Sequence, residues 1–156
     1  MNLHNVYGID IECYDPCIND KRGVSWVYGE GHILCVSVYN ASKDKKTVMK
    51  GCPEKLKTLL LDPKVILVGH NIQYDIGWLE YELKIQGQTK AILIDTMIAE
   101  ALLNEYDRKD LDSVAKKRLG IGKKKTRIET WAEDRKLRGD FRKYLKDAPW
   151  ELLKEY

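Results

Sequence analysis

The sequence predicts an α/β domain with a mixed β-sheet, in which an antiparallel meander comes first, parallel strands follow, and helices flank the sheet. Apolar and β-branched segments dominate the first third of the chain. Helices then alternate with short apolar strands, and only helical segments come after them. The 156 residues suit one domain with a core of its own, and no linker or internal repeat divides them.

The first half of the chain is expected to form the meander. Apolar residues at 5–12 lead into two carboxylates and predict a buried strand, whereas the proline and three glycines within 14–31 predict a loop or the approach to a hairpin. Alternating apolar residues predict a second strand at 32–39, and a short third strand at 46–49 follows a polar turn. A helix is expected at 53–61, because its opening proline suits a first helical turn.

The second half is expected to alternate between strands and helices. The fully apolar residues 65–68 predict a strand that glycine ends, and a helix is expected at 72–83. Another short strand at 92–94 leads to an Asp-Thr pair that can cap a helix at 95–104. Three further helices are expected, at 110–119 with a glycine C-cap, at 126–146 with poor periodicity, and at 149–156 after a proline.

The composition is that of a soluble globular protein, with 33% charged and 44% hydrophobic residues. No apolar run is long enough to span a bilayer, and the first residues lack the basic start and apolar stretch of a signal peptide. We therefore expect a cytoplasmic protein without a membrane partner. The four cysteines lack the spacing of a metal site, so they are expected to be reduced thiols.

Asp10 and Glu12 form the most informative pair in the sequence. Residues two apart on a strand point to the same face, so their carboxylates would lie close together. Such charges repel unless a cation lies between them, and Mg²⁺ and Mn²⁺ prefer oxygen ligands. The pair therefore predicts a metal site for phosphate chemistry. The alternative is an exposed acidic pair at the end of a strand.

Residues 69–75, GHNIQYD, form a second constellation between an expected strand and an expected helix. Gly69 permits the tight turn, and Asp75 falls in the first helical turn, above the carboxyl end of the sheet, where ligands of α/β proteins collect. Asn71 offers a hydrogen-bonding amide and Tyr74 a flat surface, and a nucleotide can use both. Alternatively, Asn71 only caps the helix and Tyr74 belongs to the core.

Two further segments have two interpretations each. The basic residues 116–125, KKRLGIGKKK, could face a phosphate backbone or form a solvated loop between helices. The segment 14–31, with Trp26, Tyr28 and the nearby His32, could line a substrate channel or cover the core.

Together, the carboxylate pair and residues 69–75 resemble the first two motifs of the DEDD 3′–5′ exonuclease superfamily. Residues 95–104 and 111–120 resemble the segments that follow in the proofreading domain of family A DNA polymerases, particularly bacteriophage ones. The resemblance runs from about residue 5 to the end of the chain. It implies a ribonuclease H-like fold and a single exonuclease domain over 1–156, working in a bacterial or phage-infected cell.

The resemblance also implies a two-metal hydrolase that removes nucleotides from DNA 3′ ends. Asp10 would contact both Mg²⁺ or Mn²⁺ ions, Glu12 the ion on the side of the nucleophile, and Asp75 the other ion, directly or through water. The substrate-binding residues would be Ile11, Asn71 and Tyr74. The implied partners are the 3′ end of single-stranded DNA and a polymerase domain in the same or a separate chain.

The fourth carboxylate of the superfamily has no counterpart here. In the tyrosine branch it belongs to a Tyr-x-x-x-Asp motif on the last helix, and residues 148–156 resemble the lead-in to that motif. Tyr156 falls at the motif tyrosine, which would orient the attacking water. Because the sequence stops there, we interpret it as a domain cut within its last helix. Asp140, Asp147 and Glu151 are the upstream acids that would have to serve instead, although their spacing gives this no support.

Three functions are compatible with these patterns. The first is a DNA-editing 3′–5′ exonuclease. The second is a catalytically incomplete nucleic-acid-binding module of the same fold. The third is a ribonuclease D-like enzyme that trims RNA, since such enzymes share the motifs and the tyrosine branch. The choice between DNA and RNA depends on contacts with the 2′-hydroxyl group.

Overall fold

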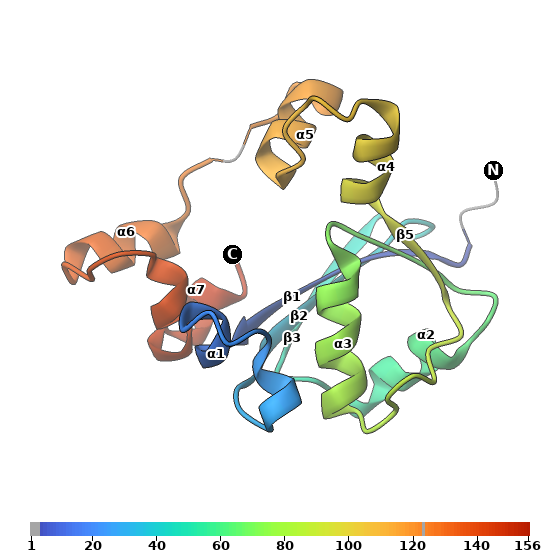
Figure 1. Cartoon of the computed structure of the whole chain (residues 1–156), viewed down its shortest axis with the longest axis horizontal. Coiled ribbons are helices and arrows are strands. Elements are labelled where there is room, and N and C mark those ends of the chain that lie inside the picture. Colours follow the sequence, from blue (N-terminus) through green and yellow to red (C-terminus); the bar gives the residue numbers. More distant parts are fainter. Residues whose placement is uncertain (1–3, 123) are drawn as a thin grey trace.

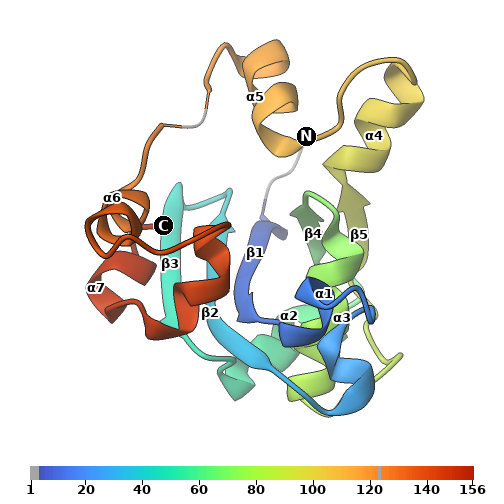
Figure 2. The same ribbon diagram turned by 60° about the vertical axis from the view of Figure 1, so that its left-hand side comes forward.

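The computed structural model describes residues 4–122 and 124–156 and contains the predicted mixed sheet. Its strands are β1 (Val6–Tyr14), β2 (His32–Asn40), β3 (Lys45–Lys50), β4 (Ile66–Gly69) and β5 (Ile92–Asp95). They lie in the order β3-β2-β1-β4-β5 (Figure 2). The first three pair antiparallel, whereas β4 pairs parallel with both β1 and β5. The predicted meander followed by parallel strands is therefore confirmed.

The helices match the expected ones in the middle of the chain and differ from them near its ends. They are α1 (Pro16–Asn19), η1 (Ser25–Tyr28), η2 (Glu54–Leu56), α2 (Lys57–Leu61), α3 (Ile72–Glu82), α4 (Thr96–Leu103), α5 (Leu111–Leu119), α6 (Arg127–Asp134), η3 (Phe141–Asp147) and α7 (Trp150–Leu153), where η marks a 3₁₀ helix. None of the described helices has the length and apolarity needed to cross a bilayer.

Three of the expected segments need correction, one loop and two helices. The segment 14–31, expected as a loop, contains α1 and η1. The helix expected at 126–146 divides into α6 and η3, because the backbone takes positive φ angles at Lys136 and Gly139 between them. The last helix ends at Leu153, so Tyr156 follows it outside regular structure.

Helices lie to either side of the sheet (Figure 1), and two apolar cores form between the helices and the strands. On one face, Ile9 and Ile11 of β1 pack in the main core, beneath α2 and α3. On the other face, Leu34 of β2 packs against a smaller core made by α6, η3 and α7, namely Ile128, Trp131, Ala132, Leu145 and Leu153. Since side chains alternate along a strand, Asp10 and Glu12 point to this second face.

Trp26 of η1 lies across the middle of α3. Its ring meets Trp78 edge-on, with the centroids 5.5 Å apart. A β-carbon added at Gly77 would approach the Trp26 ring within 2.5 Å, so glycine is what allows this close contact. Trp26 therefore covers the main core, which agrees with the second interpretation of residues 14–31, namely that this segment covers the core.

Asp95, at the end of β5, joins the starts of two helices. Its carboxylate accepts hydrogen bonds from the backbone N–H groups of Met97 and Ile98, which confirms the predicted cap of α4. The same carboxylate accepts from Asn71 N–H at 3.0 Å and Ile72 N–H at 3.1 Å, at the start of α3. The turn at Asn71, within residues 69–75, is thus fixed by a residue at the end of the neighbouring strand β5.

The basic residues after α4 are partly engaged within the chain. Glu100 of α4, only 3% exposed, binds Lys117 and Arg118 of α5, each at 2.8 Å. Lys125 is paired with Glu133. These ion pairs give the basic segment a structural role, and its contact with phosphate stays a prediction.

We expect Asp95→Ala to destabilise the fold by about 2 kcal/mol, because two helix starts lose their cap and each cap contributes about 1 kcal/mol. Urea denaturation followed by circular dichroism measures this loss. Asp110→Ala is the matched control, since Asp110 caps α5 alone. An equal loss of stability in the two variants would contradict the double role of Asp95.

Candidate functional site

The structure places Asp10 and Glu12 on one face of the central strand β1. At these two positions β1 pairs with β2 alone, because its pairing with β4 ends at Gly8. Asp10 lies opposite Ser37 of β2 and is exposed. The pairing register with β2 shifts between Glu12 and Cys13. Such an irregularity turns the strand locally, and it redirects the side chains at its end.

Asp75 comes from the first turn of α3 and is only 5% exposed. Its Oδ1 atom accepts a hydrogen bond of 3.3 Å from the Ile11 backbone N–H, which ties α3 to β1 between the two acidic residues. Burial, together with the negative charge of Asp10, raises the pKa of Asp75 from 3.8 to about 8. Asp10 and Asp75 therefore lie close enough for their charges to oppose each other.

These carboxylates fit a divalent metal site in their chemistry. Within residues 4–122 and 124–156, no three acidic, histidine or cysteine side chains already converge as ligands of one ion. Asp10 and Asp75 nevertheless offer hard oxygen donors with mutual repulsion, and a cation between them would relieve it. Asp10, Glu12 and Asp75 remain the residues that we predict to hold Mg²⁺ or Mn²⁺.

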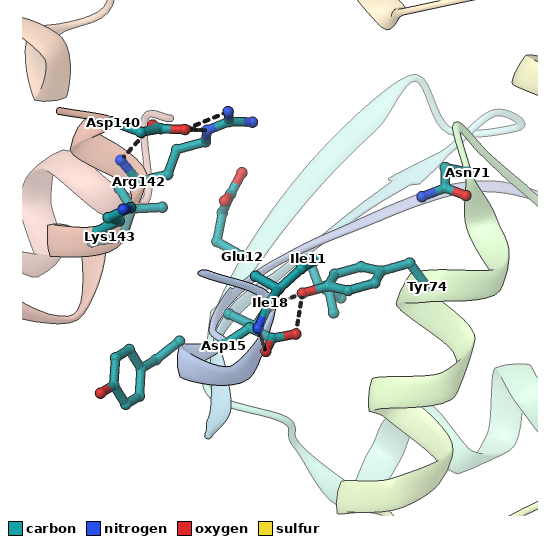
Figure 3. A pocket seen from close by; sticks show the side chains of 12 residues that line it. Ile11, Glu12, Asp15, Ile18, Asn71, Tyr74, Asp140, Arg142 and Lys143 are labelled. Carbon is teal, nitrogen blue, oxygen red and sulfur yellow. Dashed lines mark hydrogen bonds and ion pairs between the residues drawn. The ribbon is translucent and has the colours of Figure 1, made fainter. Parts of the chain in front are cut away.

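A cavity of about 460 Å³ opens beside Glu12 and contains the predicted substrate-binding residues (Figure 3). Asn71 and Tyr74 line one wall. Asn71 has a left-handed backbone and makes no side-chain cap, since Asp95 takes that role. The cap interpretation of Asn71 is therefore wrong. Ile11 also lines the cavity, although its side chain is 94% buried in the main core.

Tyr74 is half-buried and held by hydrogen bonds. Its hydroxyl donates to Asp15 Oδ2 at 2.8 Å and lies 3.0 Å from Cys13 Sγ. Asp15 also accepts hydrogen bonds from the Ser25 backbone and hydroxyl and from Ile18 N–H, so it links residues 14–31 to α3. Burial raises the pKa of the Tyr74 phenol, which keeps it protonated. One wall of the cavity is thereby fixed.

Tyr156 lies near the acidic pair Asp10 and Glu12, on the face of the sheet that packs against α6, η3 and α7 and not on the face that packs against α3. Its ring packs edge-on against Phe141, with the centroids 5.9 Å apart. Burial and the negative charges of Glu12 and Asp10 raise the pKa of its phenol. A second cavity, of about 380 Å³, is lined by Tyr156, Asp10 and His70 among others. The structure thus brings Tyr156 near Asp10 and Glu12, two of the predicted metal ligands, although α7 ends before it.

Sequence reasoning missed the basic residues of η3. Arg142 and Lys143 line the first cavity, across from Tyr74 (Figure 3). They lie in the segment expected to be a poorly periodic helix, where no pattern distinguishes them from other surface charges. Asp15 had a detectable signal, because Asp-Pro commonly begins a helix, and it caps α1.

Two of the three upstream acids are held in ion pairs. Asp140 lines the first cavity, but Arg142 binds both of its oxygens. Glu151 is paired with Lys154 and is mostly exposed. Asp147 ends η3.

Comparisons with known proteins bear on the family and the fold of the chain. A family model described as 3′–5′ exonuclease matches residues 4–148. Among curated protein sequences, none is detectably similar to the chain.

Several solved structures share the fold. Brucella melitensis NrnC bound to pGG has 15% sequence identity and a TM-score of 0.65, with 96% of this chain and 63% of that chain covered. NrnC with bound Mg²⁺ has 19% identity and a TM-score of 0.60, with 78% and 57% covered. Trypanosoma brucei RNase D in complex with RNA U12 has 15% identity and a TM-score of 0.65, with 96% and 50% covered. The chain thus spans between half and two thirds of these structures.

We expect Asp75→Asn to change how the metal-free protein responds to pH. The folded state binds the Asp75 proton more tightly than the unfolded state, so the stability from this group is full below about pH 4 and is lost as pH rises towards about 8. Relative to the variant, the parent should lose up to about 1.4 kcal/mol per pH unit across this range. Urea denaturation in EDTA at several pH values measures the difference, and parallel curves would contradict the raised pKa.

Proposed function

The chain belongs to the 3′–5′ exonuclease family, and on that premise we propose that it removes nucleotides one at a time from the 3′ ends of single-stranded DNA, as a proofreading enzyme does in replication. The observation that carries this proposal is the repulsion between the carboxylates of buried Asp75 and Asp10. The two lie beside the cavity that is lined by Asn71 and Tyr74. Carboxylates whose negative charges oppose each other near such a cavity suit metal-dependent phosphodiester hydrolysis.

In this proposal, Asp10, Glu12 and Asp75 would hold two divalent ions, and such ions would supply Lewis-acid chemistry for activating a water and stabilising the leaving 3′ oxygen. The Ile11 N–H group keeps the Asp75 carboxylate turned towards β1. Asn71 donates or accepts hydrogen bonds at the terminal nucleotides, and the Tyr74 ring supports a base or sugar. Placement and charge neutralisation are the main contributions of the protein.

Tyr156 would orient the attacking water. Its raised pKa keeps the phenol protonated near neutral pH, so it acts as a hydrogen-bonding group and not as a base. The contact of its ring with Phe141 limits the directions in which the hydroxyl can point.

RNA is the second candidate substrate. Solved structures that share the fold include an RNase D in complex with RNA U12 and NrnC bound to pGG. These relatives favour an enzyme that trims RNA or very short nucleic acids, as the ribonuclease D-like alternative holds.

The first test is hydrolysis of a 5′-labelled single-stranded DNA with Mg²⁺ or Mn²⁺. We expect a ladder that shortens from the 3′ end, and we expect Asp10→Ala to lower the rate by at least about a thousandfold, because it removes the carboxylate assigned to both ions. Asp62→Ala, an exposed change in a turn far along the chain, is the control. Equal rates for Asp10→Ala and the parent would refute the metal-site assignment. Binding without cleavage by the parent would favour the incomplete nucleic-acid-binding module.

The second test separates DNA from RNA. A DNA oligonucleotide, its RNA counterpart and a DNA strand with a single 3′-terminal ribonucleotide are compared under identical conditions. If the enzyme edits DNA, we expect kcat/KM to be highest for all-DNA and to fall about tenfold or more with one terminal 2′-hydroxyl group. A preference for the RNA strand would replace the proofreading proposal with RNA trimming.

A further inference from the structure

Arg142 occupies a distinctive position among the basic residues described. It comes from η3, which packs on the face of the sheet that carries Asp10 and Glu12. Figure 3 shows its side chain on the wall facing Tyr74, with Glu12 between the two. No sequence motif assigned a role to this residue.

Asp140 holds the guanidinium group of Arg142 in one orientation. Arg142 Nε donates to both carboxylate oxygens of Asp140, at 3.0 and 2.9 Å, and Nη2 donates to Oδ2. This contact uses one edge of the planar group and leaves Nη1 and its N–H groups on the other edge. The side chain is 67% exposed, so a ligand can reach that edge. A guanidinium fixed in this way is suited to phosphate oxygens.

The cavity wall that η3 contributes has a net positive charge, because Asp140 offsets only one of its two cations. The negative charges of Glu12 and Asp15 lie on other parts of the cavity lining, where Asp15 accepts hydrogen bonds from Tyr74 and Ser25. Lys143 adds a second positive charge beside Arg142. A strand whose terminal nucleotide lies against Tyr74 would therefore bring a phosphate towards Arg142 and Lys143.

We propose that Arg142 and Lys143 form a phosphate-binding pair that grips the nucleic-acid strand next to the scissile bond, with Asp140 as the positioning residue for Arg142. The identity of the ligand rests on the proposed function. The pair acts in binding, so it can be measured without hydrolysis.

The test measures binding of a 5′-fluorescein-labelled single-stranded DNA by fluorescence anisotropy in EDTA, where no metal-dependent cleavage occurs. We expect Arg142→Ala to weaken binding about tenfold and to flatten its salt dependence, since a charge-assisted contact with phosphate is lost. Arg142→Lys should lose less, because it keeps the charge, and Asp140→Asn should fall between the parent and Arg142→Ala.

Arg138→Ala is the matched control, because Arg138 is an exposed arginine of the same region outside the cavity. A second probe carries uncharged methylphosphonate linkages at its 3′ end. With this probe, the difference between Arg142→Ala and the parent should disappear.

Equal affinities of Arg142→Ala and Arg138→Ala, or no binding of the DNA by the parent, would overturn the proposal. So would an undiminished effect of Arg142→Ala with the methylphosphonate probe. These outcomes are separate from those of the hydrolysis assay. If the chain binds DNA through Arg142 but produces no ladder, the phosphate-binding pair stands and the proposed function fails. If the chain produces a ladder but Arg142→Ala binds DNA as Arg138→Ala does, the proposed function stands and the phosphate-binding pair fails.

Discussion

The Asp95 carboxylate is the constraint on which the site depends. By accepting hydrogen bonds from the starts of α3 and α4, it fixes the left-handed turn at Asn71. That turn directs the Asn71 amide into the cavity and sets the first turn of α3, where Asp75 lies. An asparagine with positive φ is uncommon and is sustained here by neighbouring contacts. The geometry of the second motif is therefore determined by a residue outside it.

Asp75 combines two opposing requirements. Its burial excludes water from the carboxylate, and the nearby Asp10 adds repulsion, so the ionised form is disfavoured in the folded protein. The bond from Ile11 N–H still holds the side chain in place. A position that opposes stability in this way is common where proteins bind cations or carry out catalysis. The same arrangement supports our assignment of the metal ligands.

The parts predicted well from the sequence are those fixed by local signals. Apolar β-branched runs gave the strands, and the Asp-Thr pair gave the cap of α4, because both depend on neighbouring residues. The split of 126–146 depends on packing of α6 and η3 in the smaller core. Likewise, Arg142 reaches the cavity only through the fold, since it lies 130 positions after Glu12 in the sequence. The spacing of Asp10 and Glu12 predicted a metal site by itself, because alternation along a strand is local, whereas the role of each residue came from the family resemblance.

The attachment of α5 has a consequence for motion. None of its residues is fully buried, and it is joined to α4 largely by Lys117 and Arg118 around Glu100. The attraction within such ion pairs weakens as ionic strength rises, whereas the apolar packing on the two faces of the sheet does not weaken. We therefore expect the α4–α5 region to open as a local unit, with amide hydrogens that exchange before those of β1 and faster as salt is added.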